Sequence, residues 1–307
     1  MADAENVIII GSGPAGLSAA LYMAREDFKP VVVSGTGAGG QLLLTTTVEN
    51  YPGFPDGVLG SEIVDRMRKQ AERFGARFVS GDVTDIDLSS RPFKVKVGDQ
   101  RYESKTVIIA TGASARWLDI ESEKKFIGKG VSSCATCDGA FAKGKDVIVV
   151  GGGDTAMEDS SFLTRFANSV TIVHRRDQFR ASRIMQNKVL SNPKIKVMYN
   201  TVVEEVLGDQ KVSGVKLKNV NTNEVTELKV QFVFVAVGYI PNTSFLKGKL
   251  DLDEQGYIVV EDEVRTKVEG CFVAGDVSDR RYRQAVTAAA AGVKAALEVR
   301  EYFQTHD

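Results

Sequence analysis

Residues 7–16 read V-I-I-I-G-S-G-P-A-G, a short apolar run that ends directly in a Gly-x-Gly-x-x-Gly turn. A helix-forming stretch, L-S-A-A-L-Y-M-A-R, follows the turn, and a second apolar strand is expected at Val31–Val33. In such a unit Gly11 permits the tight turn, Gly13 lets the backbone approach a pyrophosphate, and Gly16 brings helix and strand together. A plain glycine-rich turn is the alternative, but the strand–turn–helix–strand setting favours a dinucleotide site with its phosphates at the helix N-terminus.

The same pattern recurs in the second half of the chain. The apolar run Val147–Val150 leads into G-G-G-D-T-A, which contains Gly151, Gly153 and Ala156, and a further strand is expected at Val170–Val173. The wide separation of the two turns indicates one fold used twice and not a short tandem repeat. Two dinucleotide sites imply two dinucleotides, commonly a flavin and a nicotinamide nucleotide.

The residues after the second predicted strand bear on the choice of nucleotide. The acid that would bind a ribose 2′-hydroxyl is absent, and residues 174–180 read H-R-R-D-Q-F-R. Arg175, Arg176 and Arg180 would neutralise a 2′-phosphate, which favours NADP over NAD. An exposed basic turn is the alternative, but the segment falls where the adenosine ribose should lie.

The first unit also lacks the acid, because Ser34 and Gly35 stand in its place. Residues 35–42, G-T-G-A-G-G-Q-L, form a second glycine-rich loop that would let a large cofactor pass close to the backbone. Further along, C-F-V-A-G-D-V at 271–277 precedes a helical run expected from about Arg283 to Phe303. This segment resembles the one with which flavoproteins hold the ribityl chain and pyrophosphate of FAD.

Two more apolar strands, expected at Thr106–Ala110 and Phe232–Val237, end in tight glycine turns on either side of the second unit. The chain is therefore expected to cross between domains close to them. We predict an α/β fold with two Rossmann-like, three-layer ββα dinucleotide-binding domains. Residues 1–114 and 244–307 would form the FAD-binding domain, into which residues 115–243 insert as the NADPH-binding domain. Residues 208–223 are expected to be a loop.

Residues 132–140, S-S-C-A-T-C-D-G-A, place Cys134 and Cys137 three positions apart with Asp138 directly behind. A zinc site needs about four ligands, and the remaining candidates are Cys271 and two scattered histidines, so no metal is expected. A structural disulfide would close too small a loop to stabilise much. A redox dithiol remains, with Asp138 as the acid that protonates the leaving thiolate. A helix N-cap is the alternative role for Asp138, and the two roles can coexist. Cys271 is expected to pack as a small apolar residue.

Composition describes a soluble globular protein, with 43% hydrophobic and 26% charged residues among 307. The net charge of -1 provides no electrostatic footprint for nucleic acid or an anionic membrane. The N-terminal M-A-D-A-E-N is acidic where a signal peptide would be basic, so a cytoplasmic location is expected. With 2 histidines, a Ser-His-Asp or Cys-His arrangement is close to excluded.

These motifs occur in an order that resembles the low-molecular-weight thioredoxin reductases, over essentially the whole chain: G-S-G-P-A-G, G-G-Q-L, V-E-N-Y-P-G, A-T-G-A, C-A-T-C-D-G, G-G-G-D-T-A, H-R-R-D-Q-F-R and A-G-D-V. The C-A-T-C-D-G segment, inside the predicted NADP domain, is the most specific of them. Glutathione-reductase-like enzymes instead have a longer-spaced pair in the FAD domain and a C-terminal histidine base.

The resemblance implies a homodimeric NADPH-dependent thioredoxin-disulfide reductase. NADPH would reduce FAD, reduced FAD would reduce the Cys134–Cys137 disulfide, and the dithiol would reduce thioredoxin. By the same analogy Cys137 faces the flavin, Cys134 attacks the thioredoxin disulfide, and Asp138 is the acid/base. Because the dithiol must meet both the flavin and a protein substrate, the NADP domain is expected to rotate on its two crossings.

The resemblance also assigns cofactor contacts. For FAD they are Gly11, Ser12, Gly13, Pro14, Ala15, Gly16, Ser34, Gly35, Gly39, Gly40, Gln41, Asn50, Val83, Ala110, Thr111, Gly112, Gly275, Asp276, Arg283, Gln284 and Ala285. For NADPH they are Gly151, Gly153, Asp154, Thr155, Ala156, His174, Arg175, Arg176 and Arg180.

The chain departs from the family after the cysteine pair. Ala140 and Phe141 stand where two aromatic residues are frequent, and Lys129 stands where arginine is common. These departures concern the grip on the partner and not the chemistry. The alternative functions are a related flavin disulfide reductase that takes electrons from ferredoxin, or one that reduces another thioredoxin-like substrate.

Overall fold

The structure of the chain is a computed structural model that describes residues 4–44 and 47–306. It divides into two compact units, one formed by residues 1–114 and 240–307 and the other by residues 115–239. The two crossing segments run side by side, because the Asn242 amide donates to the Gly112 carbonyl (3.0 Å) and the Arg116 amide to the Gly238 carbonyl (2.9 Å). The second unit ends at Tyr239, a few residues before the boundary after residue 243 that the sequence predicts.

The first unit is built on a seven-stranded sheet. Its order is β5 (Arg77–Val79), β2 (Val31–Val33), β1 (Glu5–Ile10), β8 (Gln100–Ile109), β7 (Phe93–Val97) and β6 (Val83–Asp87), and β19 (Cys271–Val273) pairs with β8. β5, β2, β1, β8 and β19 run parallel to their neighbours in this set. Their carboxyl ends therefore meet at one edge of the sheet, where open α/β sheets hold ligands. The strands expected at Val7–Ile10 and Val31–Val33 are confirmed.

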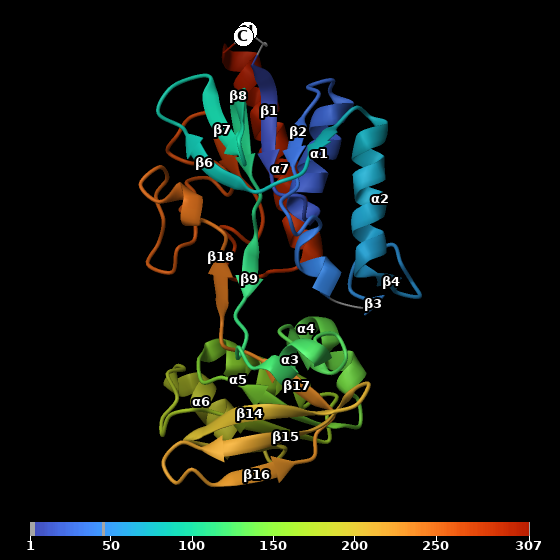
Figure 1. The fold of residues 1–307 in the computed structure, drawn as a ribbon, viewed down its shortest axis with the longest axis vertical. Helices are drawn as coiled ribbons and strands as arrows, with labels where there is room; N and C mark the ends of the chain where they lie inside the picture. The colour runs from blue at the N-terminus through green and yellow to red at the C-terminus, as the bar shows by residue number, and fades with distance from the viewer. Residues whose placement is uncertain (1–3, 45–46, 307) are drawn as a thin grey trace. The chain divides into compact units, whose positions relative to one another are not determined.

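Alternate residues of β1 face opposite layers of the first unit. Val7 and Ile9 pack against the helices α1 (Pro14–Arg25) and α7 (Ala285–His306), whereas Ile8 and Ile10 pack against β6 and β7. Full burial of each such side chain contributes about 1.5–3 kcal/mol. Figure 1 shows α1 beside α7, with α2 (Gly60–Arg73) next to α1. The remaining short elements of this unit are η1 (Gly40–Leu44), β3 (Thr47–Val48), β4 (Val58–Leu59) and η3 (Ser244–Leu246), while β9 (Ala113–Ala115) and β18 (Tyr239–Pro241) lie at the two crossings.

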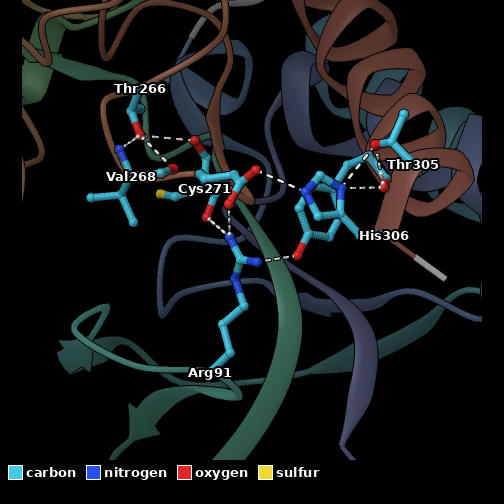
Figure 2. Close-up of polar contacts among 8 residues, drawn as sticks. Arg91, Thr266, Val268, Cys271, Thr305 and His306 are labelled. Atoms are coloured by element: carbon cyan, nitrogen blue, oxygen red, sulfur yellow. Dashed lines mark hydrogen bonds and ion pairs between the residues drawn. The ribbon is translucent and has the colours of Figure 1, made fainter.

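The last helix begins later and ends later than the sequence suggests. Arg283 has a positive φ of 48°, which a helix does not accept, so α7 starts at Ala285. Its end is tied to the sheet by the cluster in Figure 2: Arg91 donates to the Tyr302 hydroxyl and to Glu269, and His306 Nε2 lies 2.8 Å from a Glu269 oxygen. Cys271 is 1% exposed in this region, which confirms that it packs as a core residue.

The second unit has a five-stranded parallel sheet. Its order is β10 (Val131–Ser132), β17 (Phe232–Val235), β11 (Asp146–Val150), β12 (Ser169–Val173) and β13 (Ile195–Met198). The helical elements are α3 (Glu121–Phe126), α4 (Ala135–Asp138), η2 (Gly139–Ala142), α5 (Asp154–Leu163) and α6 (Arg183–Leu190). The strands expected at Val147–Val150 and Val170–Val173 are confirmed within one residue.

A second sheet covers the other face of the parallel one. It is antiparallel and consists of β14 (Thr201–Gly208), β15 (Val212–Asn219) and β16 (Val225–Leu228). Val147 and Val149 face α5 and α6, while Ile148 and Val150 face β14 and β15, so the unit has three layers. Expecting a loop at residues 208–223 was wrong, because the alternating apolar positions of V-S-G-V-K-L-K form the half-buried strand β15. Among the described helices none combines the length and the apolar character that crossing a membrane requires.

Candidate active site

The two cysteines lie at the carboxyl edge of the parallel sheet in the second unit. The short strand β10 ends at Ser132, and two residues separate it from α4, which begins at Ala135. Cys134 and Cys137 form a disulfide across this turn, with their Cα atoms 5.3 Å apart. The Cys134 sulfur also accepts a hydrogen bond of 3.2 Å from the Cys137 amide and so occupies the N-cap position of α4. The pair is therefore held by one helical turn.

Asp138 lies directly behind the disulfide in a partly buried position. Burial raises the pKa of the Asp138 carboxyl above its ordinary value, and a hydrogen bond with Ser132 opposes this shift. Ser132 also accepts from the Cys134 amide (3.0 Å), so one hydroxyl supports both the turn and the acid. Asp138 occupies the N-cap position of η2 but makes no side-chain capping bond there. A carboxyl in this state keeps its proton at a higher pH and can donate it.

The glycine turn of the second unit lies at the same sheet edge as the disulfide. Gly151 follows β11 with φ of 157°, and a Cβ there would lie 2.4 Å from the Ala236 carbonyl oxygen. At Gly153 a Cβ would meet no described atom within 4 Å, so the N-terminus of α5 is open on that side. Because β10, β17 and β11 are parallel neighbours, the disulfide and this turn share one edge.

The basic segment forms the loop between β12 and α6. Arg175, Arg176 and Arg180 are exposed, and among the described residues no carboxylate forms an ion pair with any of them. His174, by contrast, is buried at 5% exposure. The segment therefore presents guanidinium groups beside the glycine turn of α5, an arrangement that suits a phosphate.

The first unit brings its predicted turns together at the carboxyl edge of its own sheet. Ser12 donates to the Ser34 carbonyl (2.9 Å) and accepts from the Gly39 amide (3.1 Å), so it joins the first turn to the second glycine loop. Gly11 has φ of 115°, and a Cβ there would lie 2.2 Å from the Ala110 carbonyl oxygen. A Cβ at Gly13 would meet no described atom within 4 Å. These turns leave the N-terminus of α1 accessible.

Asp276 lies where β19 ends, at the same edge of the first unit. Its Oδ1 is buried and has no hydrogen-bond partner among the described residues, and the same holds for the Ser34 hydroxyl. Burial, with a smaller contribution from Asp279, raises the pKa of Asp276 to about 7, although Arg283 opposes the shift. An orphaned acceptor of this kind fits a ligand that carries hydroxyl groups, as the ribityl chain of a flavin does.

Three more predicted residues, Thr111, Asn50 and Gln284, are held in place by hydrogen bonds. Thr111 donates to the Asn242 carbonyl and accepts from the Asn242 side chain, both at 2.9 Å. Asn50 donates to Gln284 (3.2 Å) and so links the loop before β4 to the start of α7. Gln41 is exposed on η1, and Val83 packs against the core from β6 without a described bond to these turns.

Sequence reasoning missed three residues that support the candidate site. They are Ser132 behind the disulfide, Asn242 across from Thr111, and Ser182, whose amide and hydroxyl both bond Asp154. Serine and asparagine in turns often bond nearby backbone groups, so their presence two residues before Cys134 and directly after Pro241 was an available signal.

Comparison with known proteins covers both units. The family described as Pyridine nucleotide-disulphide oxidoreductase matches residues 5–292. A thioredoxin reductase from Rickettsia prowazekii is 50% identical over 302 residues, 97% of each chain. Another from Streptomyces coelicolor is 51% identical over 306 residues, 99% of this chain and 95% of that one. The solved thioredoxin reductase from Giardia duodenalis matches with a TM-score of 0.93 and 44% identity, over 97% of this chain and 98% of that one.

Proposed function

The chain belongs to the pyridine nucleotide-disulphide oxidoreductase family and, within it, to the thioredoxin reductases, and on this premise we propose its electron path and site residues. Electrons pass from NADPH through a bound FAD to the Cys134–Cys137 disulfide and from there to thioredoxin. The observation that carries the proposal is the disulfide at the same sheet edge as a glycine turn and an arginine loop. The proposed site for the electron donor, NADPH, and the disulfide that accepts the electrons thus lie in one unit.

The chemistry of the disulfide follows from its two sulfurs. A bound FAD would supply the relay that turns the two-electron donor NADPH into a reductant for sulfur. When the disulfide takes up two electrons, the sulfur–sulfur bond breaks, and two protons complete the two thiols. The Cys134 thiolate then attacks the thioredoxin disulfide to form a mixed disulfide, and the Cys137 thiolate displaces reduced thioredoxin. This second attack restores the Cys134–Cys137 bond.

Asp138 supplies and recovers the proton in these steps. Its position behind Cys137 and its raised pKa keep a neutral acid next to a sulfur that becomes negative. A thiolate in a partly buried site is costly unless it is protonated or paired. Asp138 therefore donates when the disulfide opens and accepts when it closes.

The first unit would hold FAD through the turns that meet at its sheet edge. The diphosphate would lie at the N-terminus of α1, where the backbone of Gly13 is open. Asp276 and Ser34, whose buried oxygens have no partner among the described residues, would accept from or donate to the ribityl chain. Ser12 acts indirectly, since its hydroxyl is already shared between Ser34 and Gly39.

The second unit would hold NADPH, with its diphosphate at Gly153 and its 2′-phosphate on Arg175, Arg176 and Arg180. A second copy of the chain would complete the enzyme as a homodimer. Reducing conditions, as in the cytoplasm, suit a disulfide that must cycle.

The test is a comparison of electron donors with oxidised thioredoxin as substrate. NADPH should support thioredoxin reduction, NADH should support it about tenfold less well or worse, and reduced ferredoxin should not support it. The Cys134→Ser variant should be inactive, whereas Cys271→Ser, a change at a buried thiol outside the site, should keep its activity. Turnover with ferredoxin and not NADPH would overturn the proposed donor, and full activity of Cys134→Ser would overturn the path.

A further inference from the structure

His174 is buried, whereas the three arginines of the basic segment are exposed. It follows the last residue of β12, and its ring lies directly over the glycine turn of α5. A Cβ at Gly152 would lie 2.2 Å from the ring Cε1 and 2.3 Å from Nδ1. Such distances are far below contact, so the ring fills the space that any side chain at Gly152 would need.

The same loop is tied back to the glycine turn at its other end. The amides of Arg180 and Ala181 both donate to the Gly152 carbonyl, at 2.7 and 3.2 Å. Two residues later, Asp154 Oδ1 accepts from the Ser182 amide (2.9 Å) and the Ser182 hydroxyl (3.0 Å). The loop that carries the arginines is therefore fastened to the turn at its start, by His174, and at its end.

His174 also fixes the shape of the loop between these ends. Its Nε2 lies 3.0 Å from the Gln178 carbonyl oxygen, to which a ring protonated at Nε2 donates. Its ring packs near Phe179, with the ring centres 5.4 Å apart. Burial, together with the nearby Arg176, Arg180 and Arg175, lowers the pKa of His174, so the ring is neutral at physiological pH. A neutral, buried ring whose Nε2 is already bonded contributes no charge to a phosphate.

We propose that His174 is a positioning residue that sets selectivity for a 2′-phosphate by holding the arginine loop against Gly152 and Gln178. The inference rests on the proposed NADPH site. It assigns the phosphate contacts to Arg175, Arg176 and Arg180 and removes them from His174. Asp154 acts with His174 by holding the far end of the loop through Ser182.

The proposal predicts a selective loss when His174 is changed. Without the ring the three like-charged side chains lose their common frame, whereas the glycine turn still binds the part of a nucleotide that lacks the 2′-phosphate. The suitable probes are 2′,5′-ADP, which carries the 2′-phosphate, and 5′-AMP, which does not. Binding of both to the oxidised holoenzyme is measured by calorimetry, and KM and kcat are measured with NADPH and NADH.

His174→Ala should weaken 2′,5′-ADP at least about tenfold and 5′-AMP less than about twofold, with KM for NADPH raised and kcat kept. His174→Gln, whose amide can reach the Gln178 carbonyl, should recover part of the loss. His306→Ala, a histidine change at the far end of α7, is the control and should bind both ligands as the parent does. Asp154→Ala should repeat the selective loss and serves if His174→Ala does not fold.

The outcomes separate this inference from the function on which it rests. If the parent enzyme binds 2′,5′-ADP no better than 5′-AMP, the proposed NADPH site itself is wrong. If the parent discriminates but His174→Ala or Asp154→Ala weakens both ligands equally, or neither, the positioning role is wrong. A selective loss in His174→Ala, or in Asp154→Ala if His174→Ala does not fold, supports the proposal.

Discussion

Asp138 and Asp276 are two carboxyl groups whose surroundings favour the neutral form, and we assign them different roles. Asp138 lies behind the disulfide with Ser132 as its partner, whereas Asp276 has a buried oxygen with no described partner. Burial raises the pKa of both. The first is suited to move a proton, and the second to bind a hydroxyl group of a ligand.

At Asp138 we predict a slower exchange of electrons with thioredoxin. Asp138→Asn keeps the size of the side chain and removes the proton, so thioredoxin reduction should fall by about 10²-fold while flavin reduction by NADPH is unchanged. The parent rate should decline as pH rises through the raised folded pKa, because the acid is lost there, and the variant should be slow and insensitive to pH. Rapid-mixing kinetics measure both steps. Asp209→Asn, an exposed control, should match the parent, and a fast Asp138→Asn enzyme would exclude the proton role.

At Asp276 we predict a pH-dependent gain in stability of the flavin-free protein. The folded pKa of about 7 lies above the unfolded value, so the group's stabilising effect is present below about pH 4 and is lost as pH rises to 7. Asp276→Asn should therefore raise the free energy of unfolding at about pH 8, by up to about 4 kcal/mol, with no gain near pH 4. Urea unfolding at the two pH values measures this. Asp276→Asn should also bind FAD more weakly. If the difference in stability between Asp276→Asn and the parent is the same at both pH values, the prediction is wrong.

The sequence predicts some of these residues well and others poorly. The three-residue spacing of Cys134 and Cys137 predicts a close cysteine pair, and the two form a disulfide in the structure. His174 is assigned to the cofactor from its place in the basic segment, but position along a loop does not say which way a side chain points. Ser132 contributes through a bond to the Cys134 amide, which depends on how the turn folds.

At the scale of elements, the contact between α1 and α7 holds the first unit's nucleotide turn in place. Gly292 faces Ala15, and a Cβ there would lie 2.0 Å from the Ala15 carbonyl oxygen. Gly275 approaches the same residue, since its Cβ would lie 2.9 Å from the Ala15 Cβ. Neither contact leaves room for a side chain, so the position of α1 depends on these glycines.

We predict that Gly292→Ala destabilises the first unit and weakens FAD retention. The added methyl group must push α7 away from α1, at a cost of about 1–3 kcal/mol. Urea unfolding and the flavin content of the purified protein are the measurements. Ala290→Ser, which adds one atom at an exposed position of the same helix, is the control. A Gly292→Ala protein with the parent's stability and flavin content would show that α7 can yield without consequence.

Elements with strong apolar patterns were the predictable ones. Val31–Val33 matches β2, and the run Val147–Val150 differs from β11 by one residue. The start of α7 was placed too early, because the positive φ of Arg283 delays the helix and the sequence does not show this angle. The antiparallel sheet on the second unit was missed because V-S-G-V-K-L-K is short and half polar, which is a weak signal for a strand.

At the scale of the whole molecule, the insertion of one unit into the other gives each dinucleotide turn its own sheet. The two crossings fall next to glycine turns, at Gly112 and Gly238, which is why the sequence could indicate them. The same division puts the disulfide in the unit with the arginine loop and Asp276 in the other unit. On the proposed path, electrons would therefore pass through both units in each turnover.

The most direct test of this electron path is an anaerobic titration of the purified flavoprotein with NADPH, followed by its absorbance. The parent protein should take up two hydride equivalents, one for the flavin and one for the Cys134–Cys137 disulfide. The Cys134→Ser/Cys137→Ser variant should take up one, and Cys271→Ser should behave as the parent. Uptake of a single equivalent by both the parent and the double variant would contradict the account.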